Sequence, residues 1–137
     1  MGTRSGLAAT LVLVAFLAAC GGSGGEEPSS YALAPTKACL QTENGVSVNT
    51  KDVDFVASTA LGGAMRVKVS PENFVVMAFG NDDAEAERIE RAYRDFAGKQ
   101  IPIDDVLQRS KNLVLVWNAP PTGEDESALT NCLKGPG

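Results

Sequence analysis

Acidic side chains form three short clusters whose spacing would allow chemistry. Asp52 and Asp54 flank a single residue and could act as the two carboxyl groups of a general acid–base pair. Residues 81–83 with Glu85, and residues 104–105, offer carboxylate and amide oxygens of the kind that bind calcium. A solvated turn at 52–54 and helix capping at 81–85 explain the same residues more simply, and no segment has the spacing and glycine of an EF-hand loop. We therefore expect no metal site and keep the carboxylate pair as an alternative.

The residue types needed for histidine-assisted nucleophilic catalysis are missing. The sequence contains no histidine, which excludes Ser-His-Asp and Cys-His arrangements. Residues 21–25 match the Gly-x-Ser-x-Gly pattern of a nucleophile elbow, but that turn needs a strand before it and a helix after it, and here a polar linker follows. The sequence therefore predicts a protein that is not an enzyme and that carries no cofactor.

Two other groups of side chains could bind a partner. Arg66 and Lys68 alternate with apolar residues, so they project from the solvent face of a predicted strand, where they could contact an anion or simply keep the surface soluble. Trp117 ends an apolar run and is expected in the core; the alternative is that its ring lines a cleft with the loop 118–121. That loop and the turn at 62–63 are where we expect binding.

The N-terminus carries the most specific pattern in the chain. Arg4 precedes an apolar run from Leu7 to Ala19, which is shorter than the roughly 20 residues of a membrane-spanning helix and typical of a signal peptide. The run ends in Leu17-Ala18-Ala19-Cys20. This motif resembles the lipobox of bacterial lipoprotein precursors, in which leucine stands three residues before the cysteine. The alternative is a plain secreted protein that is cut one or two residues further on.

The resemblance implies how the chain is divided and where it resides. Residues 1–19 would be removed as a signal peptide, Cys20 would carry a diacylglyceryl group, with or without a third chain on its amine, and residues 20–30 would form a flexible Gly/Ser/Glu tether. Each buried CH₂ contributes about 0.8 kcal/mol, so two or three chains anchor firmly. The mature protein would be a cell-envelope lipoprotein, anchored on the extracytoplasmic side and not spanning the membrane.

The remaining cysteines are Cys39 and Cys132. Export to an oxidising compartment favours a disulfide between them, which would tie the two ends of the domain together. The alternative is a pair of buried free thiols. A zinc site is disfavoured, because two cysteines without histidine cannot complete four ligands unless carboxylates take part.

The charge of the chain limits the kinds of partner. Beyond residue 19 there are 11 basic and 17 acidic residues, for a net charge of −6. An acidic domain without a basic run argues against binding nucleic acid and against electrostatic attraction to anionic lipid. The covalent lipid is therefore the expected membrane contact, and the partner is an unidentified protein or envelope ligand.

Periodicity and turn residues predict the secondary structure. The expected elements of the first half are a helix at 35–44, a strand at 54–60, a hairpin turn at 62–63, a half-buried strand at 64–69 and a central strand at 74–79. In the second half they are a helix at 82–97, a short helical segment at 103–109, a strand at 113–117 and a last helix that begins after Thr122.

The longest helix is the clearest of these elements. Asp82 is expected to cap it in a reciprocal arrangement with Glu85. One apolar stripe runs along the helix and consists of Ile89, Ala92, Tyr93 and Phe96. A strand on either side of this helix predicts that the segments 74–79 and 113–117 are parallel neighbours.

The expected fold class is a single α+β domain over residues 31–137. It has a mixed β-sheet with one hairpin and one strand–helix–strand unit, and helices pack on the sheet. The expected function is that of a non-catalytic binding or interaction module. Its alternatives are an accessory subunit of an envelope complex and a hydrolase that uses carboxylates.

Overall fold

The computed structural model describes residues 27–137, so the predicted signal peptide, Cys20 and most of the predicted tether lie outside the described residues. Five strands form one sheet in the order β1-β2-β3-β5-β4, and every neighbouring pair is antiparallel. The strands are β1 Ser47–Asn49, β2 Ala64–Lys68, β3 Phe74–Phe79, β4 Leu107–Ser110 and β5 Leu113–Trp117.

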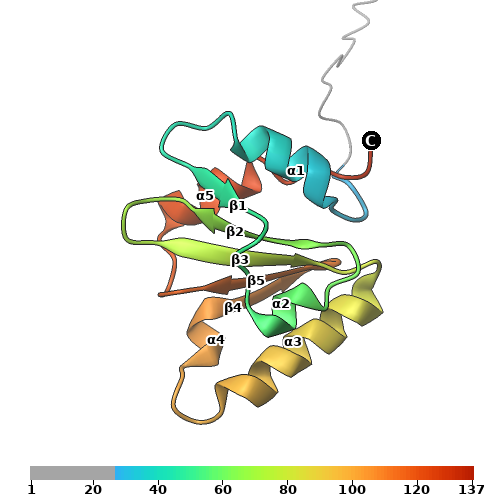
Figure 1. Cartoon of the computed structure of the whole chain (residues 1–137), viewed down its shortest axis with the longest axis vertical. Coiled ribbons are helices and arrows are strands. Elements are labelled where there is room, and N and C mark those ends of the chain that lie inside the picture. Colours follow the sequence, from blue (N-terminus) through green and yellow to red (C-terminus); the bar gives the residue numbers. More distant parts are fainter. Residues whose placement is uncertain (1–26) are drawn as a thin grey trace, which may run out of the picture.

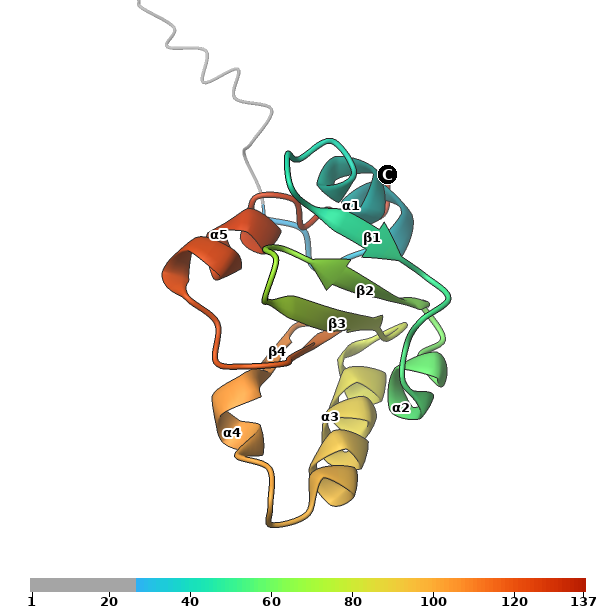
Figure 2. The same cartoon turned by 60° about the vertical axis from the view of Figure 1, so that its left-hand side comes forward.

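Helices cover both faces of this sheet, as Figures 1 and 2 show from two directions. The helices α1 (Leu33–Leu40) and α5 (Gly123–Thr130) lie on one face. The helices α2 (Phe55–Ser58), α3 (Asp83–Ala97) and α4 (Ile103–Val106) lie on the other. The α+β fold class and the single domain are therefore confirmed.

The alternation of side chains along the strands produces two separate cores. Met65, Val67 and Met77 are fully buried on the α1/α5 face together with Leu40 of α1. Val76, Ala78 and Val114 point to the other face and pack with residues of α2 and α3. Because β3 contributes to both cores, its continuously apolar sequence is explained, and the prediction of a central strand is confirmed.

The prediction of parallel neighbours is wrong. β5 pairs with β3 in the antiparallel direction, with Met77 opposite Leu115. The crossover through α3 leads instead to β4, which runs parallel to β3 but is separated from it by β5. β5 returns from β4 by a tight turn at Lys111, whose φ is 55°, and inserts between the two strands. The sheet is antiparallel rather than mixed.

The predicted strand at 54–60 is also wrong, because that segment forms the short helix α2. Asp54 caps the helix by accepting a hydrogen bond from the amide of Ala57 at 2.9 Å. The β-branched and aromatic residues after Asp54 favoured a strand, but the cap and the burial of Val56 and Ala57 against α3 decide for a helix.

The turn at residues 62–63 therefore does not connect two strands of a hairpin. The amide of Gly62 donates to the carbonyl of Phe79 at 2.8 Å, and the amide of Phe79 donates to Gly63 at 2.9 Å. A Cβ on Gly62 would lie 2.5 Å from the Phe79 carbonyl oxygen, and Gly63 has a φ of 89°. Glycine is required here because the chain passes directly against the end of β3. The hairpin of the fold is β2–β3, closed by the turn at 70–73.

The segment 103–109 is helical only in its first half. α4 ends at Val106, and Leu107–Ser110 form the edge strand β4. An edge strand with one buried apolar residue, Leu107, carries too little alternation to be recognised in the sequence.

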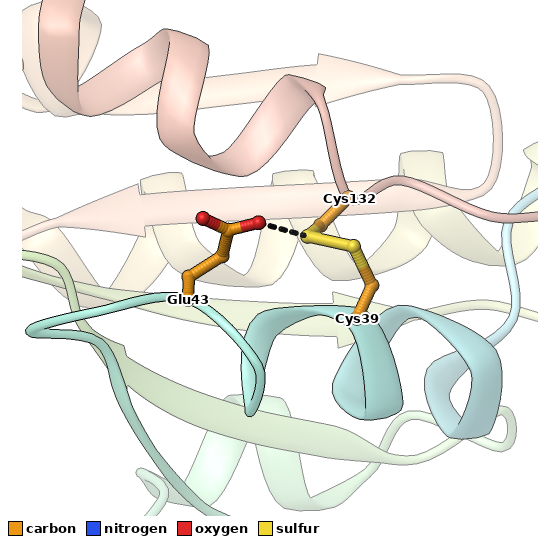
Figure 3. Close-up of side chains that lie close together, drawn as sticks. All are labelled: Cys39, Glu43 and Cys132. Atoms are coloured by element: carbon orange, nitrogen blue, oxygen red, sulfur yellow. Dashed lines mark hydrogen bonds between the residues drawn. A yellow bond between two sulfur atoms is a disulfide. The ribbon is translucent and has the colours of Figure 1, made fainter.

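Both ends of the domain are joined by a disulfide. Cys39 lies in α1, and Cys132 lies just after the end of α5, 93 positions further along the chain. Figure 3 shows the bond between the two sulfurs. The predicted disulfide is thus present, and it connects two helices that pack on the same face of the sheet.

Candidate functional site

Three of the four large apolar side chains that are exposed among the described residues border a groove on the α2/α3/α4 face. Its volume is about 470 Å³. It is lined by Asp54, Phe55, Val56, Tyr93, Phe96, Ala97, Ile101, Ile103, Val106, Val116, Trp117 and Asn118. We call it the apolar groove. It runs between α2 and the end of α3, and the end of β5 contributes to it.

Three of the lining residues face solvent to an unusual degree. Phe55 is 73% exposed, Phe96 is 70% exposed and Ile101 is 52% exposed. The rings of Phe55 and Phe96 lie side by side, with their centroids 6.3 Å apart. Contiguous apolar side chains that remain in water are uncommon on a monomer and mark surfaces that another molecule covers.

Phe96 departs from the sequence prediction in an informative way. It continues the apolar stripe of α3, in which Ile89 is fully buried and Tyr93 is 8% exposed. The first two side chains pack against the sheet and α2, whereas Phe96 in the last helical turn has only the ring of Phe55 as an aromatic neighbour. The stripe therefore extends beyond the core of the domain and onto its surface.

One hydrogen-bonded pair holds the two helices of the groove together. The hydroxyl of Tyr93 donates to the carboxylate of Asp54, with oxygen–oxygen distances of 2.8 and 3.0 Å. The same carboxylate caps α2. Burial raises the pKa of Tyr93, and the neighbouring Asp54 carboxylate raises it further. The phenol therefore remains protonated and acts as a clamp between α2 and α3, not as an acid or base.

A second concavity, the polar hollow, lies on the same face of the sheet beside β1 and β2. Its volume is about 460 Å³. It is lined by Ser47, Asn49, Asp52, Arg66, Lys68, Pro71, Glu72, Asn73 and Phe74. Asn49, Arg66 and Val76 are neighbours across three strands, and Val76 packs on the α2/α3/α4 face. The strand side chains of the hollow therefore belong to this same face, at a place that the helices do not cover.

The two basic residues of β2 lie where the alternation predicted, on the face opposite to the buried Met65 and Val67. The structure adds that this face is hollowed. The guanidinium of Arg66 stacks on the ring of Phe74, with its central carbon 3.7 Å from the ring centroid. One of its nitrogens lies 3.5 Å from a carboxylate oxygen of Asp52.

The predicted carboxylate clusters are not assembled into one site. Asp52 lines the polar hollow, whereas Asp54 lines the apolar groove. Asp82 caps α3 by accepting from the amide of Glu85 at 2.8 Å, as predicted. The return bond is different, because Glu85 accepts from the amides of Asn81 and Leu61 rather than from that of the cap residue.

The remaining acidic pair belongs to a surface ion-pair network. Asp104 contacts Arg94 at 2.5 Å, and the hydrogen bond between them raises the pKa of Arg94. Arg94 also contacts Glu90, which in turn binds Arg109 of β4 at 2.5 Å. These charges connect α3 with α4 and the edge strand. Glu90, Arg94 and Arg109 line a small concavity of about 200 Å³, which neither Asp104 nor Asp105 lines.

Trp117 is 2% exposed, so the prediction of a core residue is confirmed. Its indole N–H donates to Gln108 at 3.0 Å. Its side chain packs in the core of the α1/α5 face, and the residue borders the apolar groove at the end of β5. The next residue, Asn118, also borders the groove, and its amide bonds the backbone of Phe74 and Glu72. The rest of the loop 119–121 lines neither concavity, and nor does the turn at 62–63.

The disulfide has one carboxylate beside it. Glu43 lies 4.0 Å from the sulfur of Cys132, and Figure 3 shows its side chain directed toward the bond. Cys39, Glu43 and Cys132 are close enough together to offer three metal ligands. Metal binding needs thiolates, however, and here both sulfurs are joined to each other. The trio is therefore not a metal site in the oxidised protein.

Sequence reasoning missed the apolar groove. Its aromatic pair joins residues 41 positions apart, and nothing local to either one signals the other. The segment after Asp54 was predicted to be a strand, but it forms a helix that Asp54 caps. Recognising this cap in the sequence would have placed Phe55 in the first turn of a helix, where it is exposed.

No family model matches the sequence, and no curated protein or solved structure is significantly similar to it. Among residues 27–137, no helix has the length and apolar character needed to cross a membrane.

Proposed function

We propose that this protein is a lipid-anchored, extracytoplasmic binding protein without catalytic activity. Cys20 is the anchor, and the apolar groove binds a segment of a partner protein. The motif Leu17-Ala18-Ala19-Cys20 supports the anchor. The observation that carries the binding function is the exposed aromatic pair Phe55 and Phe96 at the edge of the groove.

The exposure of these residues favours a polypeptide over a small molecule. A small ligand that enters the groove would contact the buried side of the lining, at Tyr93, and would leave the outer rings in water. A chain that lies across the groove covers Phe55, Phe96 and Ile101 at once. Aromatic residues at the centre of an interface contribute most of its binding energy.

The charges around the groove indicate the chemistry of this partner. The residues among or between its lining positions include four acidic and two basic side chains: Asp54, Asp95, Asp104, Asp105, Arg94 and Lys99. Arg94 and Asp104 pair with each other, and Asp54 is bonded to Tyr93, which leaves Asp95 and Asp105 against Lys99. The complementary segment is apolar with basic residues at its flanks. The same acidic surroundings disfavour an anionic bilayer as the occupant.

The position of the groove agrees with a partner other than the supporting membrane. The first described residues lie beside α1, where the amide of Ala32 donates to the carbonyl of Lys134. The groove is formed by helices of the opposite face of the sheet (Figure 2). A tether that enters on the α1 side thus leaves the groove accessible from the other side.

The anchor is tested by the intact mass of the protein from the membrane fraction of the cells that make it. A chain that begins at Cys20 and is heavier by acyl groups is expected. The Cys20→Ala variant should lack the added mass and leave the membrane fraction. An unlipidated wild-type chain in the soluble fraction would overturn the anchor.

The groove is tested by photo-crosslinking in the same cells. Phe96 is replaced by a photoreactive phenylalanine derivative, and the control carries the same group at Leu61, which is 74% exposed but does not line the groove. Only the variant at Phe96 is expected to give a discrete adduct, and the cross-linked peptide should be apolar with basic flanks.

Three results would contradict this binding function: an adduct with lipid, an adduct with a second copy of the chain, and equal labelling from both positions. An adduct that copurifies in fixed stoichiometry with several envelope proteins would assign the protein as the accessory subunit of a complex. That outcome keeps the groove as the binding surface and specifies its partner further.

A further inference from the structure

We propose that the polar hollow binds the carboxylate of a small, hydroxyl- or amide-bearing ligand, and that Arg66 receives this carboxylate in place of Asp52. The proposal is independent of the anchor and of the apolar groove. It concerns a separate concavity with a different, charged lining.

Arg66 is held in position for this role. Its guanidinium carbon lies over the ring of Phe74, 3.7 Å from the centroid, and this cation–π contact restrains the group through its face rather than through its N–H groups. Within residues 27–137 the side chain donates no hydrogen bond that meets normal geometry, and its one ionic contact, with Asp52, is long at 3.5 Å. The N–H groups along the edge are therefore available to a planar acceptor such as a carboxylate.

Lys68 supplies a second positive charge on the same side of the hollow. It lies two residues beyond Arg66 on β2, so the two side chains point to the same face of the sheet, with Cα atoms roughly 7 Å apart. Among the described residues, the ammonium group of Lys68 has no ion-pair partner. Two adjacent cations attract a carboxylate to this side of the hollow.

Asp52 is bound only weakly by Arg66, at the place where the carboxylate of the ligand would lie. The side chains of Asp52 and Arg66 are 72% and 38% exposed, and ion pairs of this exposure contribute little to stability. Asp52 is nevertheless kept nearby, because Asn49 accepts hydrogen bonds from the amides of Lys51 and Asp52 and so fixes the turn. An incoming carboxylate must displace Asp52, which makes this residue a competitor of the ligand.

The remaining lining determines what kind of molecule carries the carboxylate. A volume of about 460 Å³ exceeds the size of a simple ion. Ser47, Asn49 and Asn73 offer a hydroxyl and amides to neutral polar groups. Glu72 on the rim repels further negative charge. The ligand that these groups recognise has one carboxylate and several hydroxyls or amides, as an acidic sugar does.

The test uses saturation-transfer NMR of the full mature chain with three probes, in nanodiscs if the chain carries lipid and in buffer if it does not. D-Glucuronate carries the required carboxylate, D-glucose lacks it but has the same ring, and inorganic phosphate offers a different oxyanion. Glucuronate is expected to receive saturation and glucose is not. The signal should weaken as salt is added. Absence of a signal from glucuronate, an equal signal from glucose, or displacement of glucuronate by equimolar phosphate would overturn the proposal.

Two variants are expected to change binding in opposite directions, and a third serves as the control. Arg66→Gln should weaken glucuronate binding about tenfold or more, since a hydrogen bond to a charged group is lost. Asp52→Asn should strengthen binding about two- to fivefold by removing the competitor. Lys51→Gln is the matched control, because Lys51 is exposed next to the hollow but does not line it.

Unchanged thermal unfolding of the three variants shows that they are folded. A loss of binding in Asp52→Asn, or equal losses in Arg66→Gln and Lys51→Gln, would contradict the assigned roles. Because none of these substitutions touches the groove, photo-crosslinking at Phe96 should be unaffected, so the two proposals fail or succeed separately.

Discussion

At the scale of single residues, the Asp54 carboxylate makes two structural hydrogen bonds at once. It caps α2 and accepts the hydroxyl of Tyr93, so it joins the start of a four-residue helix to the middle of a long one. Such a short helix has little stability of its own. Its position, and with it one wall of the apolar groove, therefore depends on this carboxylate and on the packing of Val56 and Ala57.

The Tyr93–Asp54 hydrogen bond makes the free energy of unfolding decrease as the pH becomes alkaline. In the folded protein the pKa of Tyr93 is raised above its ordinary value of 10.0, whereas in the unfolded chain it is not. The stabilisation is therefore fully present below pH 10 and is lost as the pH rises above it, because only the unfolded chain then releases the proton.

Tyr93→Phe should lower the free energy of unfolding by about 1–2 kcal/mol at pH 8. At pH 11 the wild type should lose about 1.4 kcal/mol of unfolding free energy through this tyrosine, and the variant should not, since it has no proton to release at this position. The difference in unfolding free energy between the two proteins should therefore shift by that amount in favour of the variant. Urea unfolding at the two pH values measures both differences. A gap that is unchanged or wider at pH 11 would contradict the assigned clamp.

At the scale of elements, α3 combines two functions along a single apolar stripe. Its first turns anchor the helix to the sheet through Ile89 and Tyr93, and its last turn presents Phe96 to solvent. The helix ends at Gly98, whose φ of 61° permits the chain to turn toward α4. The same 3.6-residue periodicity therefore builds a core at one end and an exposed apolar surface at the other.

This division can be measured by two substitutions on the stripe. Ile89→Ala removes a fully buried side chain and should cost about 2–5 kcal/mol of unfolding free energy. Phe96→Ser alters an exposed side chain and should change stability by no more than about 0.5 kcal/mol. Urea denaturation of both variants distinguishes the two roles; comparable losses would show that Phe96 is part of the core.

At the scale of the whole molecule, the disulfide closes the domain. Cys39 and Cys132 are 93 positions apart, and between them lies the entire sheet. Cross-linking so long a segment restricts the unfolded chain far more than a short loop would. The bond also holds α1 and the end of α5 together on the face where the chain enters the domain, opposite to the apolar groove.

Reduction of this bond should destabilise the domain by about 4–5 kcal/mol on the chain-entropy estimate. Thermal unfolding with and without dithiothreitol measures the effect, and the Cys39→Ala, Cys132→Ala double variant serves as the control that must not respond to the reductant. A loss below about 1 kcal/mol in the wild type would mean that the reduced, unfolded chain already restricts this loop.

The sequence by itself determined the features that depend on residues close together in the chain. Capping by Asp82 and Thr122, the alternation along β2, the burial of β3 and the stripe of α3 all follow from interactions within about one or two helical turns or strand steps. The cysteine pair also followed, because only two cysteines remain once Cys20 is assigned to lipid, an assignment that stays a prediction.

Only the tertiary structure decided the direction of β5, the helical form of α2 and both concavities. The position of β5 depends on pairing with β3 and β4 at once, and the exposed pair Phe55 and Phe96 exists because two helices meet beyond the core. The polar hollow exists because the helices leave part of one sheet face uncovered. Such features arise from contacts between residues tens of positions apart, which local periodicity does not encode.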